Sequence, residues 1–186
     1  MHPSELHKKA DAFFSEVFRR NPAAKHCCEG CRLAHCCYEP AYADTNEIKH
    51  IVDLLSEKQR EQVKQRLPDW LAKVQPLLAT EMPGALPYRR LQAPCPLLNL
   101  ETNECMVYDR RPFGCRSLFA RDNPEHCALE HRERQQYGEF PGSYNLLAEY
   151  FFSHQTLEMD HIGALLIEAL TGTSCETESR KKYGTD

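Results

Sequence analysis

Hydrophobic residues recur at helical spacing in the first part of the chain. Between Ser4 and Arg20 they fall on one face of a helix, which Ser4 can cap. These apolar positions are Leu6, Ala10, Phe13, Phe14, Val17 and Phe18. The sequence "NPAAK" follows, and a residue before proline avoids the helical conformation. The pattern therefore predicts a first helix over residues 4–20.

A second helical pattern begins near Asp44, because Asp44 and Glu47 have the spacing of a capping box. Its apolar face consists of Ile48, Ile51, Val52 and Leu55. The stretch "SEKQREQVKQRLPDWLAKVQPLLATE" comes next and carries Pro68 and Pro76. Proline disrupts a helix interior, so we expect two or three short helices here instead of one long helix.

The pattern changes between Met82 and Cys115, where repeated prolines exclude a long helix. Within it, "CPLLNLETNECMVYD" predicts a small β-hairpin with a turn near Thr102 and Asn103. A further helix is expected to start at Asn123–Pro124. The segments "SYNLLAEYFFSHQ" and "MDHIGALLIEALTG" predict two more helices, and Gly172 ends the second.

Composition excludes several classes of protein. The chain has 186 residues, of which 41% are hydrophobic and 27% charged, which is an ordinary globular balance that can bury a core without disulfides. A net charge of -4 provides no basic field for nucleic acid or an anionic membrane. The N-terminus has no secretory pattern, and no segment approaches the roughly 20 apolar residues of a membrane span. We therefore expect a cytoplasmic protein, whose ten cysteines need an explanation other than disulfides.

The cysteines form two groups. The segment "HCCEGCRLAHCCYE" places five of them in eleven positions, and its ligand candidates are Cys28, Cys31, Cys36 and Cys37, with Cys27 alongside. The second group is Cys95, Cys105 and Cys115. A C-x2-C spacing lets two sulfurs reach one ion and occurs in both zinc and iron–sulfur sites. Loops rich in proline and glycine are poor places for core packing, so metal binding explains these cysteines better than burial does.

The surroundings of the cysteines favour thiolates. Nearby cations lower the pKa of a thiol and offset the charge of several thiolates on one ion. Such cations flank both groups: Lys25, Arg32, Arg110, Arg111 and Arg116. Gly114 lets the backbone approach closely, so that an N–H could donate to a sulfur.

Several assignments stay open. Neighbouring side chains point apart, so Cys36 and Cys37 need not serve one ion in the same way, and Cys27 is a further candidate. Cys127 and Cys175 are better explained by packing or by a position in the tail. His26 and His35 precede cysteine pairs and could complete a site, but nine histidines make chance proximity common. No cysteine stands out with a predictable catalytic base, so the catalytic residues are unknown and enzymatic activity is left open.

The predicted architecture is mainly α. We expect a single domain over residues 1–186, in which an irregular cysteine-rich metal-binding lobe accompanies the small β-hairpin. Residues 26–40 and 93–120 form this lobe, and a helical insertion at 44–80 separates its two parts. Residues 173–186 are expected to be a flexible tail.

The cysteine motifs resemble those of the YkgJ-type cysteine cluster family, the CxxCxxCC proteins that chelate zinc or iron. "CCEGCRLAHCC" is similar to the family's C-x2-C and cysteine pair, and "APCPLL" to its CP loop. "ECMVYDRRPFGCRSL" resembles its closing box, which is the most specific piece, and the resemblance covers about residues 27–120. Four residues separate Cys31 from the cysteine pair here, whereas the family name implies two. This difference leaves the ligand roles of Cys36, Cys37 and Cys27 open. The resemblance implies bound zinc or iron, including iron as an iron–sulfur cluster, and implies no settled reaction.

Three functions are compatible with these features. The first is a metal-binding protein that holds zinc or iron through clustered thiolates. The second is an iron–sulfur-dependent enzyme or an electron-transfer partner, methyltransferase-like by analogy with flagellin lysine methylase. The third is a zinc-stabilised adaptor that binds a protein partner. The expected partners are a metal ion and, in the third case, another protein, with neither nucleic acid nor a membrane.

Overall fold

Helices dominate the part of the chain that the computed structural model describes, which is residues 1–22, 25–26, 34–78, 90–117, 119–120, 145–146, 148–150, 153 and 159–173. Among its α-helices are α1 (Pro3–Arg20), α2 (Thr45–Leu54), α3 (Glu57–Leu78), α5 (Phe113–Arg116) and α7 (Ile162–Thr171). Two 3-10 turns accompany them, η1 (His35–Tyr38) and η2 (Tyr108–Arg110). The mainly α class predicted from the sequence is confirmed.

The strands are short and form antiparallel pairs. β1 (Lys25–His26) pairs with β5 (Phe119–Ala120), and β2 (Tyr42–Asp44) pairs with β6 (Met159–His161). The predicted hairpin is present as β3 (Leu98–Asn99) and β4 (Glu104–Cys105), with Leu98 opposite Cys105. Asn103 adopts a left-handed φ of 55° in the turn, a conformation that asparagine tolerates.

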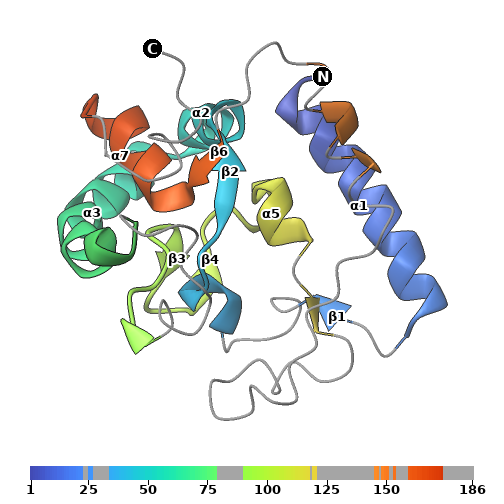
Figure 1. Cartoon of the computed structure of the whole chain (residues 1–186), viewed down its shortest axis with the longest axis horizontal. Helices are drawn as coiled ribbons and strands as arrows, with labels where there is room; N and C mark the ends of the chain where they lie inside the picture. The colour runs from blue at the N-terminus through green and yellow to red at the C-terminus, as the bar shows by residue number, and fades with distance from the viewer. Residues whose placement is uncertain are drawn as a thin grey trace.

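The main core lies between α2, α3 and α7, with α3 and α7 side by side in Figure 1. The four apolar residues predicted to line one face of α2 are all buried: Ile48, Ile51, Val52 and Leu55. The capping box is also confirmed, since the Asp44 and Glu47 side chains each bond the other's backbone N–H. Helix α7 ends as predicted at Gly172, whose φ of 71° suits glycine.

The prediction that prolines divide residues 57–78 into short helices is wrong, because α3 continues through Pro68 and Pro76. Each proline removes one backbone hydrogen bond from a helix. Both prolines lie on the exposed side of α3, whereas its other side buries five large residues in the core: Val63, Leu67, Trp70, Val74 and Leu78. Burial of this side stabilises the helix enough to offset the lost backbone bonds.

Two predicted helix starts are also displaced. Helix α1 begins at Pro3 and not at Ser4, because the ring of His2 caps it by accepting a bond from the N–H of Ser4. Helix α7 begins at Ile162, because Met159–His161 pair as a strand with Tyr42–Asp44. This long-range pairing has no local signal in the sequence. The helix predicted from Asn123 and the tail after Thr173 lie outside the described residues, and residues 145–146 and 148–150 of the segment before β6 are helical.

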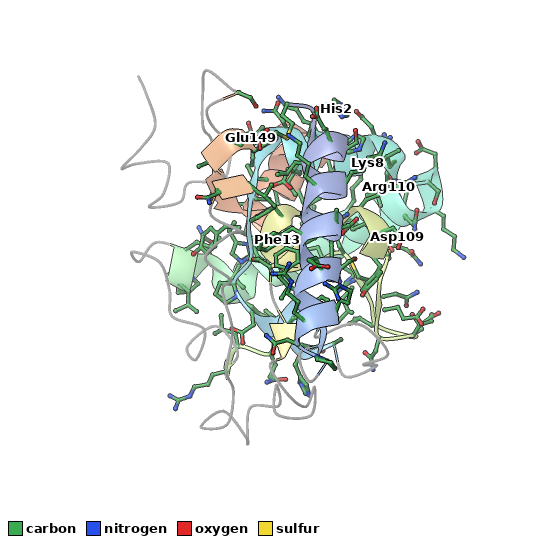
Figure 2. The ribbon with its side chains drawn as sticks, turned by 90° about the vertical axis from the view of Figure 1, so that its right-hand side faces the viewer. His2, Lys8, Phe13, Asp109, Arg110 and Glu149 are labelled. Carbon is green, nitrogen blue, oxygen red and sulfur yellow. The ribbon has the colours of Figure 1, made fainter. Side chains whose placement is uncertain are left out.

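Helix α1 packs through a second apolar cluster on the opposite side of the molecule from α3 (Figure 1). Its buried Phe14 lies against Phe113 of α5, with ring centroids 6.5 Å apart. Figure 2 shows α1 along this face, with Glu149 beside its first half and Asp109 and Arg110 on its other side. Tyr150 is buried in the same apolar cluster, so the helical residues before β6 help to hold α1 in place, and Lys9 forms an exposed ion pair with Glu149 beside it.

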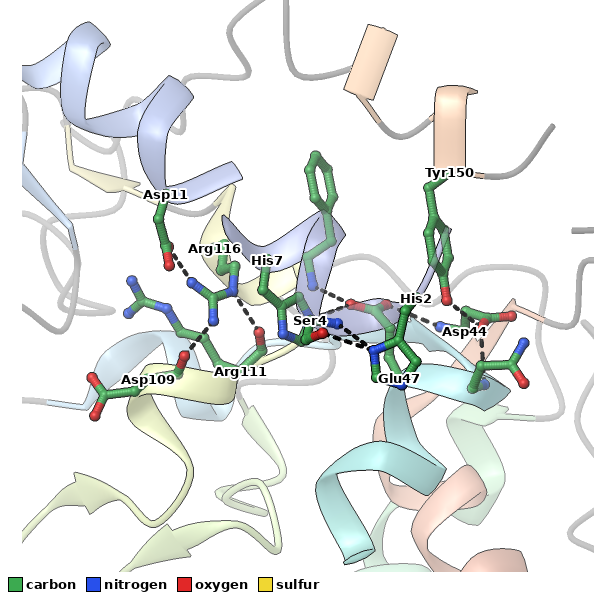
Figure 3. Close-up of polar contacts among 12 residues, drawn as sticks. His2, Ser4, His7, Asp11, Asp44, Glu47, Asp109, Arg111, Arg116 and Tyr150 are labelled. Atoms are coloured by element: carbon green, nitrogen blue, oxygen red, sulfur yellow. Dashed lines mark hydrogen bonds and ion pairs between the residues drawn. The ribbon is translucent and has the colours of Figure 1, made fainter. Parts of the chain in front are cut away.

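A buried polar network joins these elements beneath α1 (Figure 3). The carboxylate of Glu47 accepts bonds from the Nε2 of His7 at 2.9 Å and from the N–H of Phe113 at 2.8 Å. The hydroxyl of Tyr150 donates to Asp44 at 2.8 Å. Because both carboxylates also cap α2, this network fixes α1, α2 and α5 relative to one another. No helix in the described ranges is long and apolar enough to cross a membrane.

Candidate metal centre

The first described part of the predicted site is the turn η1, which carries Cys36 and Cys37. Ala34 precedes it with a left-handed φ of 49°, and its carbonyl accepts the N–H of Cys37 at 2.9 Å. Both cysteines are partly exposed. In a 3-10 turn, consecutive residues differ by about a third of a revolution, so the two side chains leave the backbone in different directions. This geometry agrees with the expectation that the two neighbouring side chains point apart, and the roles of the two thiols stay a prediction.

The second part is the loop that leads into the β3–β4 hairpin. The N–H of Leu98 donates to the carbonyl of Cys95 at 2.9 Å and closes a turn around Pro96. The N–H of Met106 donates to the carbonyl of Leu97 at 2.9 Å and continues the pairing next to Cys105. The hairpin thus returns Cys105 to the neighbourhood of Cys95, and an electrostatic interaction between their thiols reflects this.

One backbone bond connects the two parts directly. The N–H of Cys95 donates to the carbonyl of Cys37 at 2.7 Å, and the sulfur-bearing residues of both segments are therefore adjacent in space. Figure 1 shows the same relation, with the η1 turn beside the hairpin. The two cysteine-rich stretches, remote in sequence, do meet at this point.

Cys115 lies on the short helix α5, close to the core. Cys95, Cys105 and Cys115 all pack against the apolar cluster between α2, α3 and α7. Gly114 has a packing role in the structure. A Cβ at this position would lie 2.6 Å from the carbonyl oxygen of Tyr42, so the glycine permits α5 to approach strand β2. This contact does not test whether a backbone N–H here could donate to a sulfur, which stays a prediction.

The environment of Cys95 controls its protonation. Burial, with a smaller contribution from the neighbouring Cys105, raises the pKa of this thiol to about 12. The backbone N–H of Leu97 donates to the Cys95 sulfur, and the Arg66 guanidinium lies nearby; both oppose the rise in pKa. Cys95 is a free thiol, and at neutral pH it is protonated. A metal ion that binds here must displace this proton, as thiolate ligation generally requires.

Two of the cations predicted to flank Cys115, Arg111 and Arg116, make structural contacts. Arg116 is buried and donates to Asp11 of α1 and to the backbone carbonyls of Asp109 and Arg111 (Figure 3). The guanidinium of Arg111 lies 4.2 Å from the centre of the Tyr108 ring. Arg116 therefore links α1, η2 and α5, and the expectation that these arginines offset thiolate charge stays a prediction.

Arg66 of α3 is the residue that the sequence analysis missed. Its guanidinium reaches the loop that carries Cys95, thirty residues further along the chain, where it donates to backbone carbonyls. Its only sequence signal is a basic side chain next to the buried position Leu67, which is common on helices. The contact could be recognised only from the fold.

Part of the predicted donor set lies outside the described residues. This applies to Cys28 and Cys31 among the predicted ligands, and to Cys27, Arg32, Cys127 and Cys175 among the other residues considered. Lys25 and His26 are described only as part of strand β1. Within the ranges that the structure describes, no group of three or more His, Cys, Asp or Glu side chains is arranged to hold a metal ion. The assignment of Cys28, Cys31, Cys36, Cys37, Cys95, Cys105 and Cys115 as ligands therefore stays a prediction.

Comparison with known proteins identifies the family. No curated protein and no solved structure matches the chain significantly. A family model, CxxCxxCC, described as a "putative zinc- or iron-chelating domain", matches residues 26–140. This match spans more than half of the chain and contains the described cysteines together with Cys28 and Cys31. The protein therefore belongs to the CxxCxxCC family of zinc- or iron-chelating domains.

Proposed function

We propose that the protein binds zinc or iron through thiolates contributed by both cysteine segments. The observation that carries this proposal is the 2.7 Å bond between the Cys95 N–H and the Cys37 carbonyl, since it makes the two segments neighbours. The proposed ligands are Cys28, Cys31, Cys36, Cys37, Cys95, Cys105 and Cys115. The family description supports metal binding in general, and the choice of metal is part of the proposal.

The donor set favours a centre that takes more than one metal ion. A single tetrahedral zinc takes four ligands, and seven thiols exceed that number. Iron–sulfur clusters are held by thiolates and accept hydrogen bonds from backbone N–H groups, as the Cys95 sulfur does from Leu97. We therefore rank an iron–sulfur cluster or a pair of metal ions above one structural zinc. The role that fits these features is metal or electron handling in the cytoplasm.

The test is metal analysis of protein purified without oxygen. Brown protein with visible absorption, iron and acid-labile sulfide would support the cluster, whereas colourless protein with stoichiometric zinc would support zinc binding. Protein that holds neither metal and takes up neither on anaerobic reconstitution would contradict the proposal.

Cysteine variants test the ligand assignment. Cys95→Ser and Cys115→Ser are expected to lose most of the bound metal, because a serine hydroxyl is a poor ligand for zinc or iron. Cys175→Ser is the matched control, since this cysteine lies outside both groups, and it should keep the full metal content. Equal metal content in all three variants would show that the ligands are wrongly assigned.

A further inference from the structure

The side chain of Arg66 is inserted among the carbonyls of the loop that carries Cys95. Its Nη1 donates to the carbonyl of Pro96 at 3.0 Å and also to that of Leu98, and its Nη2 donates to the carbonyl of Cys95 at 3.2 Å. Three carbonyls of one short loop thus converge on one guanidinium. A planar group with several fixed donors is suited to this task, and a lysine could not reproduce it.

These bonds determine the direction of the backbone N–H that faces a sulfur. The carbonyl of Pro96 and the N–H of Leu97 belong to the same peptide group, and the described residues contain no cis peptide. In a trans peptide the C=O and the N–H point in opposite directions. Arg66 binds the Pro96 carbonyl on one side, and the Leu97 N–H on the other side donates to the sulfur of Cys95. The arginine therefore orients the donor that the sulfur accepts.

The charge of Arg66 also lies close to the thiols. No carboxylate of the described chain lies within ion-pair distance of its guanidinium, which is partly buried. Burial lowers the pKa of the guanidinium, and Cys95, Tyr38 and Cys37 would favour its charged form once they are ionised. The three backbone carbonyls offset part of the cost of burying this cation, and a neighbouring negative charge would offset more of it. Thiolates formed at Cys37 and Cys95 on metal binding would supply that charge.

We propose that Arg66 is a positioning residue of the thiolate centre, orienting the Pro96–Leu97 peptide toward the Cys95 sulfur and placing a positive charge beside Cys37 and Cys95. This inference rests on the proposed metal-binding function and deepens it. It also gives α3 a part in the centre, although α3 lies in the segment between the two cysteine groups. Groups that orient and tune ligands in this way typically change metal affinity about 10–100-fold when they are removed.

The test uses the full chain, prepared without metal or oxygen and titrated with Co²⁺, whose sulfur-to-cobalt charge-transfer absorption reports thiolate ligation. Arg66→Met removes both the donors and the charge and is expected to weaken Co²⁺ binding about 10–100-fold. The charge-transfer band should also move to longer wavelength, because the thiolates lose a neighbouring positive charge. Arg66→Lys keeps the charge without the planar donors and should recover part of the affinity and most of the band position.

Arg60→Met is the matched control. Arg60 lies on the same helix and also donates to backbone carbonyls, those of Leu55 and Asp53, but none of its described contacts involves a cysteine. It should bind Co²⁺ with wild-type affinity and an unshifted band. Far-UV circular dichroism of the metal-free variants checks that each is folded, and Arg66→Lys provides the test should Arg66→Met not fold.

Different outcomes reject different claims. Wild-type affinity and band position in Arg66→Met would overturn the role of Arg66 and leave metal binding intact. An equal loss in Arg60→Met would also overturn it, because the effect would then follow from helix stability. A wild-type protein that binds neither Co²⁺ nor Fe²⁺ would overturn the proposed function and this inference together.

Discussion

Two buried histidines show how position determines the role of a residue type. His7 is bonded to the carboxylate of Glu47 and joins α1 to α2. His161 lies between the rings of Trp70 and Tyr42, with centroids 5.1 and 5.8 Å away, and its Nδ1 accepts the N–H of Gly163 to cap α7. Burial lowers the pKa of His161 to about 3, so the folded protein keeps this ring neutral.

This shift predicts that acid weakens the fold through His161. The unfolded chain binds a proton at His161 near pH 6.5, whereas the folded chain binds it only near pH 3. The contribution of the neutral His161 ring to the free energy of unfolding is therefore fully present above pH 6.5 and is lost as the pH falls toward 3. At pH 5 the loss is about 2 kcal/mol relative to pH 7.

The measurement is urea unfolding of wild type and His161→Asn between pH 7 and pH 5. Asparagine can still cap α7 but does not titrate in this range. The variant starts from a lower stability, because a smaller side chain leaves space beside Trp70, but its free energy of unfolding should fall less with acid. Parallel pH profiles for the two proteins would contradict the assignment of this effect to His161.

At the scale of elements, the sequence predicted a local structure correctly where the residues that stabilise it lie a few positions apart. The capping box at Asp44, the turn at Asn103 and the end of α7 at Gly172 each depend on residues a few positions apart, and the sequence predicted all three. The β2–β6 pairing and the continuation of α3 depend on distant packing, for which the sequence has no local signal. The same holds at the site. Spacing identified the cysteines, but Arg66 could be found only from the fold.

The unbroken course of α3 leads to a second prediction. Pro68 is exposed and leaves the carbonyl of Lys64 without its helical donor. Replacement of Pro68 by alanine restores that N–H, removes the ring clash and should raise the free energy of unfolding by about 1–3 kcal/mol. Chemical denaturation of both proteins measures the change. An unchanged or lower stability would mean that α3 is bent at Pro68 to fit the core, and that the proline is needed there.

At the scale of the whole molecule, the apolar core and the proposed centre are held by different forces. The core between α2, α3 and α7 is apolar and depends on burial, and Cys95, Cys105 and Cys115 pack only at its edge. In the described residues of the cysteine segments, the backbone pairing consists of two-residue strands, β1 with β5 and β3 with β4. Structural zinc in small sites contributes on the order of 10 kcal/mol, which is comparable to the net stability of a domain. Metal would therefore order the cysteine segments far more than it orders the helices.

Metal removal should consequently act on one part of the molecule. With metal bound, we expect slow hydrogen exchange at the amides of Cys95, Leu98 and Met106, whose bonds tie the hairpin loop to η1 and to itself. After chelation these amides should exchange at least tenfold faster, because the ligands no longer hold the loop, whereas Leu166 within α7 should change little. Exchange measured with and without chelator tests this directly. Uniform acceleration at Leu166 and at Cys95 would show that metal supports the entire fold, and unchanged exchange at all four amides would place the metal away from this loop.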